Sequence, residues 1–349
     1  MNSIEMFKEY YKEMKEKVDD ALKIYNESLV EENSFIKTNV DYFTDLNSGG
    51  KDIRGVLVTL GYHLLKEEKE TSIPLALAYE VFQTAILVHD DIIDQDDKRR
   101  GKETIHKRNR DLLNDTHISN SIAICMGDYG LYSANKIISD SYKESPHLGE
   151  ILSYFNNTVL NTIRGELLDV ILPIKSKKEE IKKEELEESI EEIYRLKTSH
   201  YTIIGPLCVG LILAGAKENQ INEITKFGEK VGIAFQIQDD ILGIYSDEMG
   251  KVKGSDIKEF KQTILFSHIM NTSYKEEFLN YYGKDNLEEE KINRVKELFI
   301  LSGSKKYAED KMNDYYNQSL NDLEKIDWID DKKKDLLKGF IEYLRNRNK

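Results

Sequence analysis

Two aspartate clusters stand where long apolar runs end, and carboxylates in this arrangement can hold a metal ion. In the first cluster Asp90 and Asp94 are four residues apart, so on a helix their side chains lie on one face, with Asp91 offset by one residue. Stacked carboxylates repel each other unless a cation lies between them. No second histidine accompanies His89 at ligand spacing, and oxygen ligands favour Mg²⁺, which commonly bridges carboxylates to a phosphate.

The second cluster, Asp239 and Asp240, follows the apolar run that starts at Phe235. One acidic cluster at a helix end is more often a solvated cap than a metal site. Two matched clusters favour metal binding, and together they would grip one diphosphate through several metals. Gln236, one turn earlier, would either present its amide oxygen to a cation or be a hydrogen-bonded core residue.

The two clusters belong to an ordered set of motifs. The first continues into Arg99, Arg100 and Gly101, and further motifs stand at 49–54, 127–129, 165–169, 197–198 and 250–257. This set, between about residues 45 and 265, resembles the motifs of the trans-isoprenyl (polyprenyl) diphosphate synthases, in particular short-chain members that make geranylgeranyl or farnesyl diphosphate. The resemblance implies a polyprenyl diphosphate synthase, that is, a prenyltransferase.

The resemblance implies Mg²⁺-dependent, head-to-tail condensation of isopentenyl diphosphate with allylic diphosphates, with three Mg²⁺ ions per active site. Metal-bound diphosphate would leave the allylic substrate, and the double bond of isopentenyl diphosphate would attack the resulting cation. A dry helical cavity would keep water from quenching that cation. The proton lost at the end would go to the departed diphosphate, since no protein base is evident.

The resemblance also assigns roles to single residues. Arg99 reaches the allylic diphosphate, and Lys197 lies near the reacting carbon. Lys51 and Arg54 would point the same way if a helix began at the preceding glycines, and they bind isopentenyl diphosphate. The residues assigned to catalysis are Asp90, Asp91, Asp94, Lys197, Thr198, Gln236 and Asp239; those assigned to metal are Asp90, Asp94 and Asp239; those assigned to substrate are Lys51, Arg54, Gln83, Arg99, Arg100, Lys251 and Lys261.

The chain departs from the family pattern at four positions. Asp52 replaces a usual arginine and Gly55 a usual proline, and the lost cation predicts weaker binding of isopentenyl diphosphate. Glu166 replaces a glutamine and adds negative charge near the metals. Gly243 replaces the third aspartate of the second motif, so we expect Asp239 to be the main ligand there.

Product length is expected to depend on the residues before Asp90. Family members with short products carry bulky aromatic residues four and five positions before the first aspartate, where this chain has Ile86 and Ala85. Phe82 lies about 4.5 Å deeper on nearly the same helical face. It would end the cavity at a C20 to C25 product, unless it only packs between helices and another residue is the floor.

Composition narrows the class of protein. The net charge of −14 over 349 residues argues against nucleic acid and anionic membranes as partners. Only two cysteines are present, which fits a reducing cytoplasm, and the charged start is unlike a signal peptide. The longest apolar run, 202–216, is short for a membrane span and contains Gly205-Pro206, so we expect a buried, kinked helix.

Helical periodicity dominates the chain, and four prolines leave long segments unbroken. These patterns predict an all-α fold without strand alternation. The absence of linkers and repeats predicts a single polyprenyl synthase domain over 1–349. The resemblance implies a bundle of long helices around a deep central cavity, of the isoprenoid synthase type, and a homodimer.

Two other functions fit part of this pattern. A class I terpene cyclase also ionises an allylic diphosphate, but Lys51, Arg54 and Gln83 would then have no second diphosphate to bind. A regulatory subunit of a heteromeric prenyl diphosphate synthase would be expected to have lost aspartates from the first motif, which is complete here.

Overall fold

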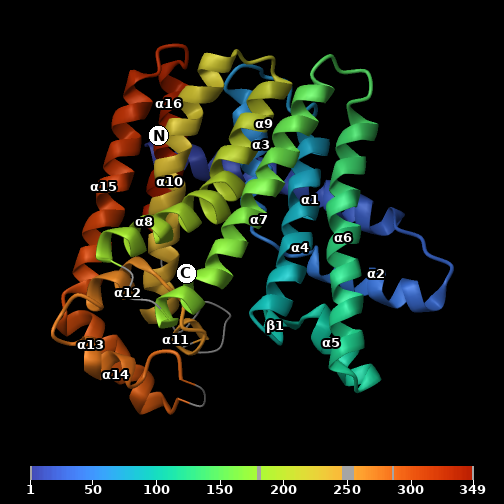
Figure 1. The fold of residues 1–349 in the computed structure, drawn as a ribbon. Helices are drawn as coiled ribbons and strands as arrows, with labels where there is room; N and C mark the ends of the chain where they lie inside the picture. Colours follow the sequence, from blue (N-terminus) through green and yellow to red (C-terminus); the bar gives the residue numbers. More distant parts are fainter. Residues whose placement is uncertain (1, 179–181, 246–254, 285–286, 348–349) are drawn as a thin grey trace. The chain divides into compact units, whose positions relative to one another are not determined.

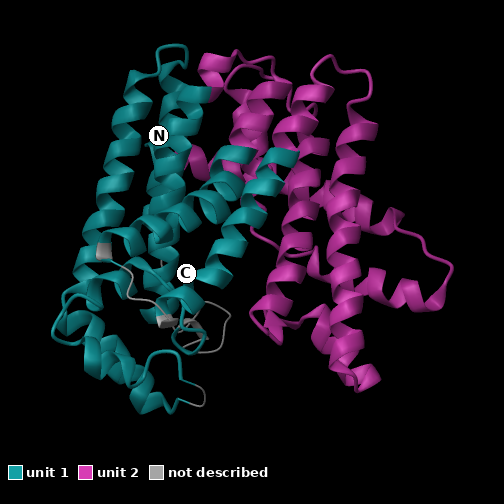
Figure 2. Cartoon of the chain, viewed as in Figure 1, with its two compact units in different colours: residues 1–4, 156–205, 222–349 teal, residues 5–155, 206–221 magenta. Residues whose placement is uncertain are grey.

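The computed structural model describes residues 2–178, 182–245, 255–284 and 287–347. Helices dominate the described ranges, where the strands are two short ones, so the all-α prediction is confirmed (Figure 1). The chain divides into two compact units: unit 1 holds residues 1–4, 156–205 and 222–349, and unit 2 holds 5–155 and 206–221 (Figure 2). The single domain over 1–349 stays a prediction.

Unit 2 carries the first aspartate motif. Its longest apolar helix, α4, lies side by side with α6, as Figure 1 shows. Its elements are α1 (Ser3–Ser28, from Glu5 on), α2 (Ser34–Leu46), α3 (Ile53–His63), α4 (Ile73–Ile93), β1 (Lys98–Arg99), β2 (Lys102–Glu103), α5 (Ile105–Leu113), α6 (Thr116–Ser141), the start of α7 (Leu148–Lys178) and most of α9 (Gly205–Leu213).

The sequence of α4 explains its position in the core of unit 2. Ser72 precedes the helix and Pro74 stands in its first turn, where a missing N–H costs nothing. Most residues between Ile73 and Ala85 are buried, so the helix is apolar on all sides rather than on one stripe. Such a rigid, enclosed helix fixes the position of the aspartates at its carboxyl end.

Unit 1 carries the second aspartate motif and the Lys197-Thr198 pair. Its elements are the rest of α7, α8 (Lys183–Ile193), the π-helix η1 (Tyr194–Ile204), α10 (Glu218–Tyr245, from Asn222 on), α11 (Ser255–Lys258), α12 (Ile264–Ile269), α13 (Lys275–Leu279), α14 (Glu289–Leu301), α15 (Ser304–Lys325) and α16 (Asp331–Arg345).

The helix expected at 202–216 has a different form from a simple kinked α-helix. Residues Tyr194–Ile204 form a π-helix, and α9 follows directly with Pro206 in its first turn. By length and composition the stretch 184–213 could cross a membrane, but 83% of its most apolar 18-residue segment is buried inside the protein. That burial is typical of a core helix.

Candidate active site

The first aspartate motif stands at the carboxyl end of α4. The helix continues to Ile93, and the backbone N–H of Asp94 still donates to the carbonyl of Asp90 at 2.8 Å. Asp90 and Asp94 therefore lie one helical turn apart, as their spacing predicts. Asp91 is directed inward, since it is only 1% exposed.

Arg99 binds the carboxylates of this motif. Its Nε donates to Asp91 Oδ1 at 2.6 Å, and its Nη2 donates to Asp90 Oδ2 at 3.0 Å and to Asp96 Oδ2 at 3.3 Å. Burial raises the pKa of Asp91 to about 7, against the opposing effect of Arg99. Burial alone would lower the pKa of Arg99, but the carboxylates outweigh it and raise that pKa. Arg99 thus supplies a cation to the carboxylates of this cluster.

The two arginines that follow the motif lie in a short hairpin and are directed toward different groups. In β1 and β2, Lys98 pairs with Glu103 and Arg99 with Lys102. The turn between the strands has positive φ at Arg100 (53°) and at Gly101 (77°), the conformation of a tight hairpin turn. Arg99 contacts the aspartates, whereas Arg100 lies near Gly50, where an added Cβ would be 3.0 Å from its Nη1. Arg100 is thereby close to the turn that precedes α3.

The turn before α3 decides whether a helix begins at the glycines, the condition under which Lys51 and Arg54 would point the same way. Helix α3 begins only at Ile53, and Asp52 before it has a left-handed φ of 48°. Lys51 therefore precedes the helix and does not share a helical turn with Arg54, so the condition is not met. The assignment of both residues to isopentenyl diphosphate stays a prediction. The left-handed φ of Gly49 (79°) and of Asp52 delays the helix start.

A buried carboxylate lies beneath this turn. Glu80 on α4 is 5% exposed, and its Oε1 accepts a hydrogen bond from the backbone N–H of Gly55 at 2.7 Å. Burial raises the pKa of Glu80 to about 7; Asp52 adds to this effect, whereas Gly55 and Arg54 oppose it. The glycine at 55 has a structural use here, because a proline would have no N–H to donate. Gln83, one turn further along α4, is also buried.

The second aspartate motif is held within unit 1 by a chain of hydrogen bonds. Thr198 Oγ1 donates to Gln236 Oε1 at 2.6 Å, and Gln236 Nε2 donates to Asp240 Oδ1 at 2.8 Å. The hydroxyl of Tyr194 donates to the other oxygen of Asp240. These bonds fit the alternative of a hydrogen-bonded glutamine, and the cation-binding role of Gln236 stays a prediction. Asp240 is 4% exposed, and both of its carboxylate oxygens accept hydrogen bonds. Asp239 is the carboxylate of this motif that remains for a metal.

Asp239 forms an ion pair with Arg347, two residues beyond α16. The guanidinium of Arg347 also lies over the ring of Phe235, 4.5 Å from its centroid. Burial lowers the pKa of Arg347 to about 10. As in the first motif, an arginine compensates the charge of the aspartates. Its position in sequence, near the end of the chain, gave no signal of this role.

Lys197 is bound by two carboxylates of α7. Its Nζ lies 2.7 Å from Glu166 Oε2 and 2.7 Å from Asp169 Oδ2. The approach depends on Gly165, because an added Cβ would lie 2.4 Å from the backbone N of Lys197. Glu166 was predicted to add negative charge near the metals. In the structure its carboxylate pairs with the positive charge of Lys197. Lys251 lies outside the described residues, and Lys261 accepts a hydrogen bond from Tyr282 at its carbonyl.

The three residues assigned to product length line up along α4. Phe82 is fully buried and packs edge-on against Phe155 and Tyr79, with ring centroids 5.2 and 6.1 Å away. Ala85 is fully buried opposite Gly130 of α6, and Ile86 is half-buried. The aromatic cluster around Phe82 fits the alternative of a packing residue as well as that of a cavity floor.

Comparison with known proteins decides the family. The polyprenyl synthetase family model matches residues 33–299. The chain belongs to the polyprenyl synthetase family. It is therefore a prenyltransferase, and the resemblance seen in its motifs is confirmed.

Several relatives of this polyprenyl synthetase cover most of its length. It is 30% identical over 302 residues to a short chain isoprenyl diphosphate synthase of Methanocaldococcus jannaschii, covering 85% of this chain and 84% of the relative. A geranylgeranyl diphosphate synthase of Sulfolobus acidocaldarius is 29% identical, with 98% and 99% covered. A geranylfarnesyl diphosphate synthase of Aeropyrum pernix is 28% identical, with 87% and 92% covered.

Solved structures of similar proteins agree. A geranylgeranyl pyrophosphate synthase from Corynebacterium glutamicum, complexed with isoprenyl diphosphate and magnesium, superimposes with a TM-score of 0.85 at 26% identity, covering 97% of this chain and 98% of that one. The geranylgeranyl pyrophosphate synthetase of Pyrococcus horikoshii gives a TM-score of 0.79 at 25% identity, with 98% of each chain covered. The synthetase thus has the isoprenoid synthase fold.

The carboxylates of the synthetase fit magnesium. Within the described ranges no three histidine, cysteine, aspartate or glutamate residues converge on one point, so neither motif forms an all-protein cage. Each instead has buried carboxylate oxygens neutralised by an arginine, namely Arg99 or Arg347. Mg²⁺ suits such sites, because it keeps several waters and takes one or two carboxylates plus phosphate oxygens.

Sequence reasoning missed four residues that shape these sites in the synthetase. Two are partners of the second motif, and two contact the turn before α3. None lies within a recognisable motif, and each acts on a residue far away in the chain. They are Tyr194, Arg347, Glu80 and Lys15.

Proposed function

We propose that this prenyltransferase condenses isopentenyl diphosphate with allylic diphosphates, head to tail, in a Mg²⁺-dependent reaction. The observation that carries the proposal is the charge arrangement of the first motif. Asp90 and Asp91 stand at the end of a buried helix with Arg99 as their counter-ion, 3.0 and 2.6 Å away. A site that needs a cation and presents an arginine is suited to a metal-bound diphosphate.

The two aspartate motifs are assigned to magnesium, through Asp90, Asp94 and Asp239, with three ions per active site as the number proposed. When bound, magnesium would neutralise the diphosphate and make it a better leaving group. Asp91 holds Arg99 in place from its buried position, and Asp240 is oriented by Tyr194.

The cations of the chain bind and orient the two substrates. Arg99, Lys197, Lys251 and Lys261 are assigned to the allylic diphosphate, where their charge would stabilise the departing group. Lys51, Arg54, Gln83 and Arg100 are assigned to the diphosphate of isopentenyl diphosphate. The nearness of Arg100 to Gly50 supports that grouping. Thr198 fixes Gln236 beside Asp240.

Apolar residues would protect the reactive carbon skeleton. Once the allylic C–O bond breaks, the double bond of isopentenyl diphosphate attacks C1 of the allylic cation, and the resulting cation loses a proton to the released diphosphate. The buried apolar length of α4 would exclude water along the growing chain. A product of C20 to C25 is proposed, because Ala85 and Ile86 leave the path along α4 open and Phe82 is the candidate floor. The names of the Sulfolobus and Aeropyrum relatives support this range.

Product analysis tests this proposal. The protein is incubated with labelled isopentenyl diphosphate and dimethylallyl, geranyl or farnesyl diphosphate, with Mg²⁺ or with a chelator, and the dephosphorylated products are separated by chromatography. We expect C20 to C25 alcohols only with Mg²⁺. Cyclic hydrocarbons made without isopentenyl diphosphate would contradict the proposal and indicate a terpene cyclase instead.

The proposed assembly is a cytoplasmic homodimer. In a two-fold pair the same helical face serves both subunits, which suits a protein built of long apolar helices. Sedimentation equilibrium at micromolar concentration should give twice the chain mass of 40.5 kDa. A single species of the chain mass would contradict the dimer.

A further inference from the structure

One face of α1 contacts the turn that carries Lys51. Tyr11 and Lys15 are four residues apart, so they lie on the same side of the helix. The Tyr11 hydroxyl donates to the carbonyl of Lys51 at 2.5 Å, and Lys15 Nζ lies 2.5 Å from Asp52 Oδ2. Helix α1 thus holds two consecutive residues of the turn.

The same face continues against the start of α3. Val18 is three residues after Lys15, and a Cβ added at Gly55 would lie 3.1 Å from its Cγ1. Behind Gly55, Glu80 of α4 accepts its N–H. The backbone from Lys51 to Gly55 is therefore fixed from two sides, by α1 and by α4.

Asp52 is turned toward α1 and not toward its own helix. It has a left-handed φ of 48°, and in the described structure its side chain makes no capping hydrogen bond to the first turn of α3. The residue is 4% exposed, and a buried carboxylate is costly without a cation. Lys15 supplies that cation and also binds Asp19 at 2.7 Å.

We propose that Lys15 and Asp52 form a positioning pair for the diphosphate of isopentenyl diphosphate. The ion pair holds the turn against α1, and this presents Lys51 and Arg54 to the substrate. The inference rests on the proposed function, which assigns those two cations to that diphosphate. Asp52 stands where the family usually has an arginine, and here it acts through the backbone of the turn.

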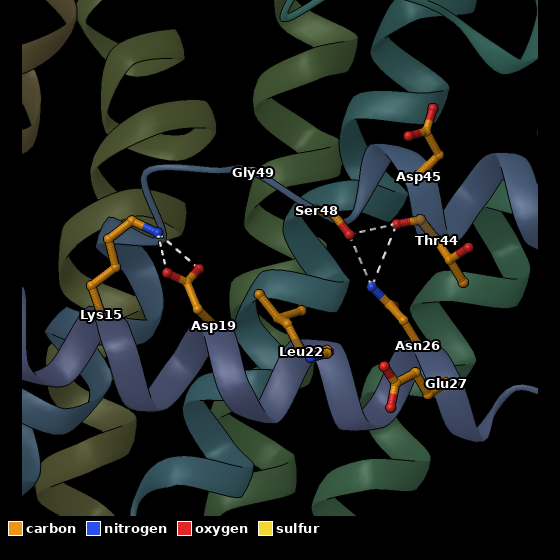
Figure 3. A pocket seen from close by; sticks show the side chains of 10 residues that line it. Lys15, Asp19, Leu22, Asn26, Glu27, Thr44, Asp45, Ser48 and Gly49 are labelled. Atoms are coloured by element: carbon orange, nitrogen blue, oxygen red, sulfur yellow. Dashed lines mark hydrogen bonds and ion pairs between the residues drawn. The ribbon is translucent and has the colours of Figure 1, made fainter.

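The surroundings of Lys15 argue against direct binding of the diphosphate by this lysine. Two carboxylates share its ammonium group, so the local charge is negative and would repel an anion. A groove of about 620 Å³ beside it is lined by residues of both charges, among them Lys23, Glu27 and Asp45. Figure 3 shows Lys15 and Asp19 on α1 beside the chain that passes through Gly49.

Steady-state kinetics of three variants test the pair. Asp52→Asn keeps the size of the side chain and tolerates a left-handed φ, and Lys15→Met keeps the length of the stem. Each should raise the KM for isopentenyl diphosphate about tenfold, equivalent to about 1.4 kcal/mol, and leave the KM for the allylic diphosphate within about twofold. Lys17→Met is the matched control on the same helix, because Lys17 pairs with the exposed Glu70.

A charge-reversed pair separates positioning from mere stability. Lys15→Glu with Asp52→Lys should recover most of the lost affinity for isopentenyl diphosphate, although Lys15→Glu alone does not. Equal changes in both KM values, together with a fall in melting temperature that matches the kinetic loss, would overturn the inference.

A further arm separates this inference from the function on which it rests. Lys51→Ala should raise the KM for isopentenyl diphosphate strongly. If it does and Asp52→Asn does not, the positioning pair is wrong and the site assignment stands. If Lys51→Ala leaves that KM unchanged, the assigned diphosphate site is wrong and the positioning pair falls with it.

Discussion

The guanidinium of Arg347 lies against the carboxylate of Asp239, where the second aspartate motif would receive a magnesium ion. The segment from Arg345 to Arg347 is held there by Gln238, whose Nε2 donates to the carbonyls of Arg345 and Arg347 at 3.3 and 3.2 Å. A metal that binds Asp239 must therefore compete with Arg347. The first motif has the same relationship with Arg99.

Arg347→Gln should tighten magnesium binding, because it removes the competing cation. We expect the Mg²⁺ concentration that half-saturates the rise in melting temperature, with inorganic diphosphate present, to fall about threefold to tenfold. Arg345→Gln is the control, since its guanidinium binds Asn317 and lies over Tyr316 instead. An unchanged or higher half-saturating concentration in Arg347→Gln would contradict the competition.

Asp90→Ala and Asp239→Ala should each lower turnover by at least about 100-fold, because each removes a ligand of a magnesium ion that would stabilise the charge of the departing diphosphate. Asp90→Ala should leave the melting temperature nearly unchanged, because Arg99 keeps Asp91 and Asp96 as partners. Asp239→Ala should lower it, because Arg347 loses its carboxylate, so turnover is compared at a temperature at which both variants are folded. Asp97→Ala is a nearby control, since the exposed Asp97 pairs with Arg110. Near-normal turnover in either motif variant would refute the metal assignment.

Substitutions on α4 should change product length. Ala85→Phe should shorten the product, and Phe82→Ala should lengthen it, because the first fills and the second opens the path along the helix. Chromatography of the dephosphorylated products measures both. Ala85 faces Gly130 closely, so melting curves must accompany the measurement. Unchanged distributions in both folded variants, or a wild type that stops at farnesyl diphosphate, would place the floor elsewhere.

Glu80→Gln should reduce the dependence of stability on pH. The pKa of Glu80 is raised to about 7 in the folded protein, so its protonated form is favoured by folding. The stability it contributes is present below its unfolded pKa of about 4.3 and is lost as pH rises through 7. A glutamine keeps the acceptor for Gly55 without the charge.

Melting temperatures at pH 5 and pH 8 check this prediction. Glu80→Gln should gain stability relative to wild type at pH 8, and the difference between the two pH values should narrow. Some dependence should remain, because the pKa values of Asp52 and Asp91 are raised too, chiefly by burial. Glu70→Gln, at an exposed site, should leave the difference unchanged, and an equal narrowing there would count against Glu80.

Local sequence determined the helices and the order of the motifs. Periodicity predicts the all-α fold, and the four-residue spacing of Asp90 and Asp94 places both on one turn at the end of α4. These features depend on residues that are only a few positions apart in the chain, so they can be predicted from the sequence. The start of α3 at Ile53 was not evident from the sequence, because the left-handed Asp52 precedes it and pairs with Lys15 on another helix.

Tertiary structure alone decided which charges meet. No residue near Asp240 in the sequence indicates that Tyr194 donates a hydrogen bond to it. Gln238 and Arg347, which also share a hydrogen bond, are 109 positions apart. In the sequence, Glu80 is one polar residue within an apolar helix, and only the structure shows that it accepts a hydrogen bond from the N–H of Gly55. Buried charges and polar groups must find partners, but the partner is chosen by which helices pack together, and helical periodicity carries no record of that choice.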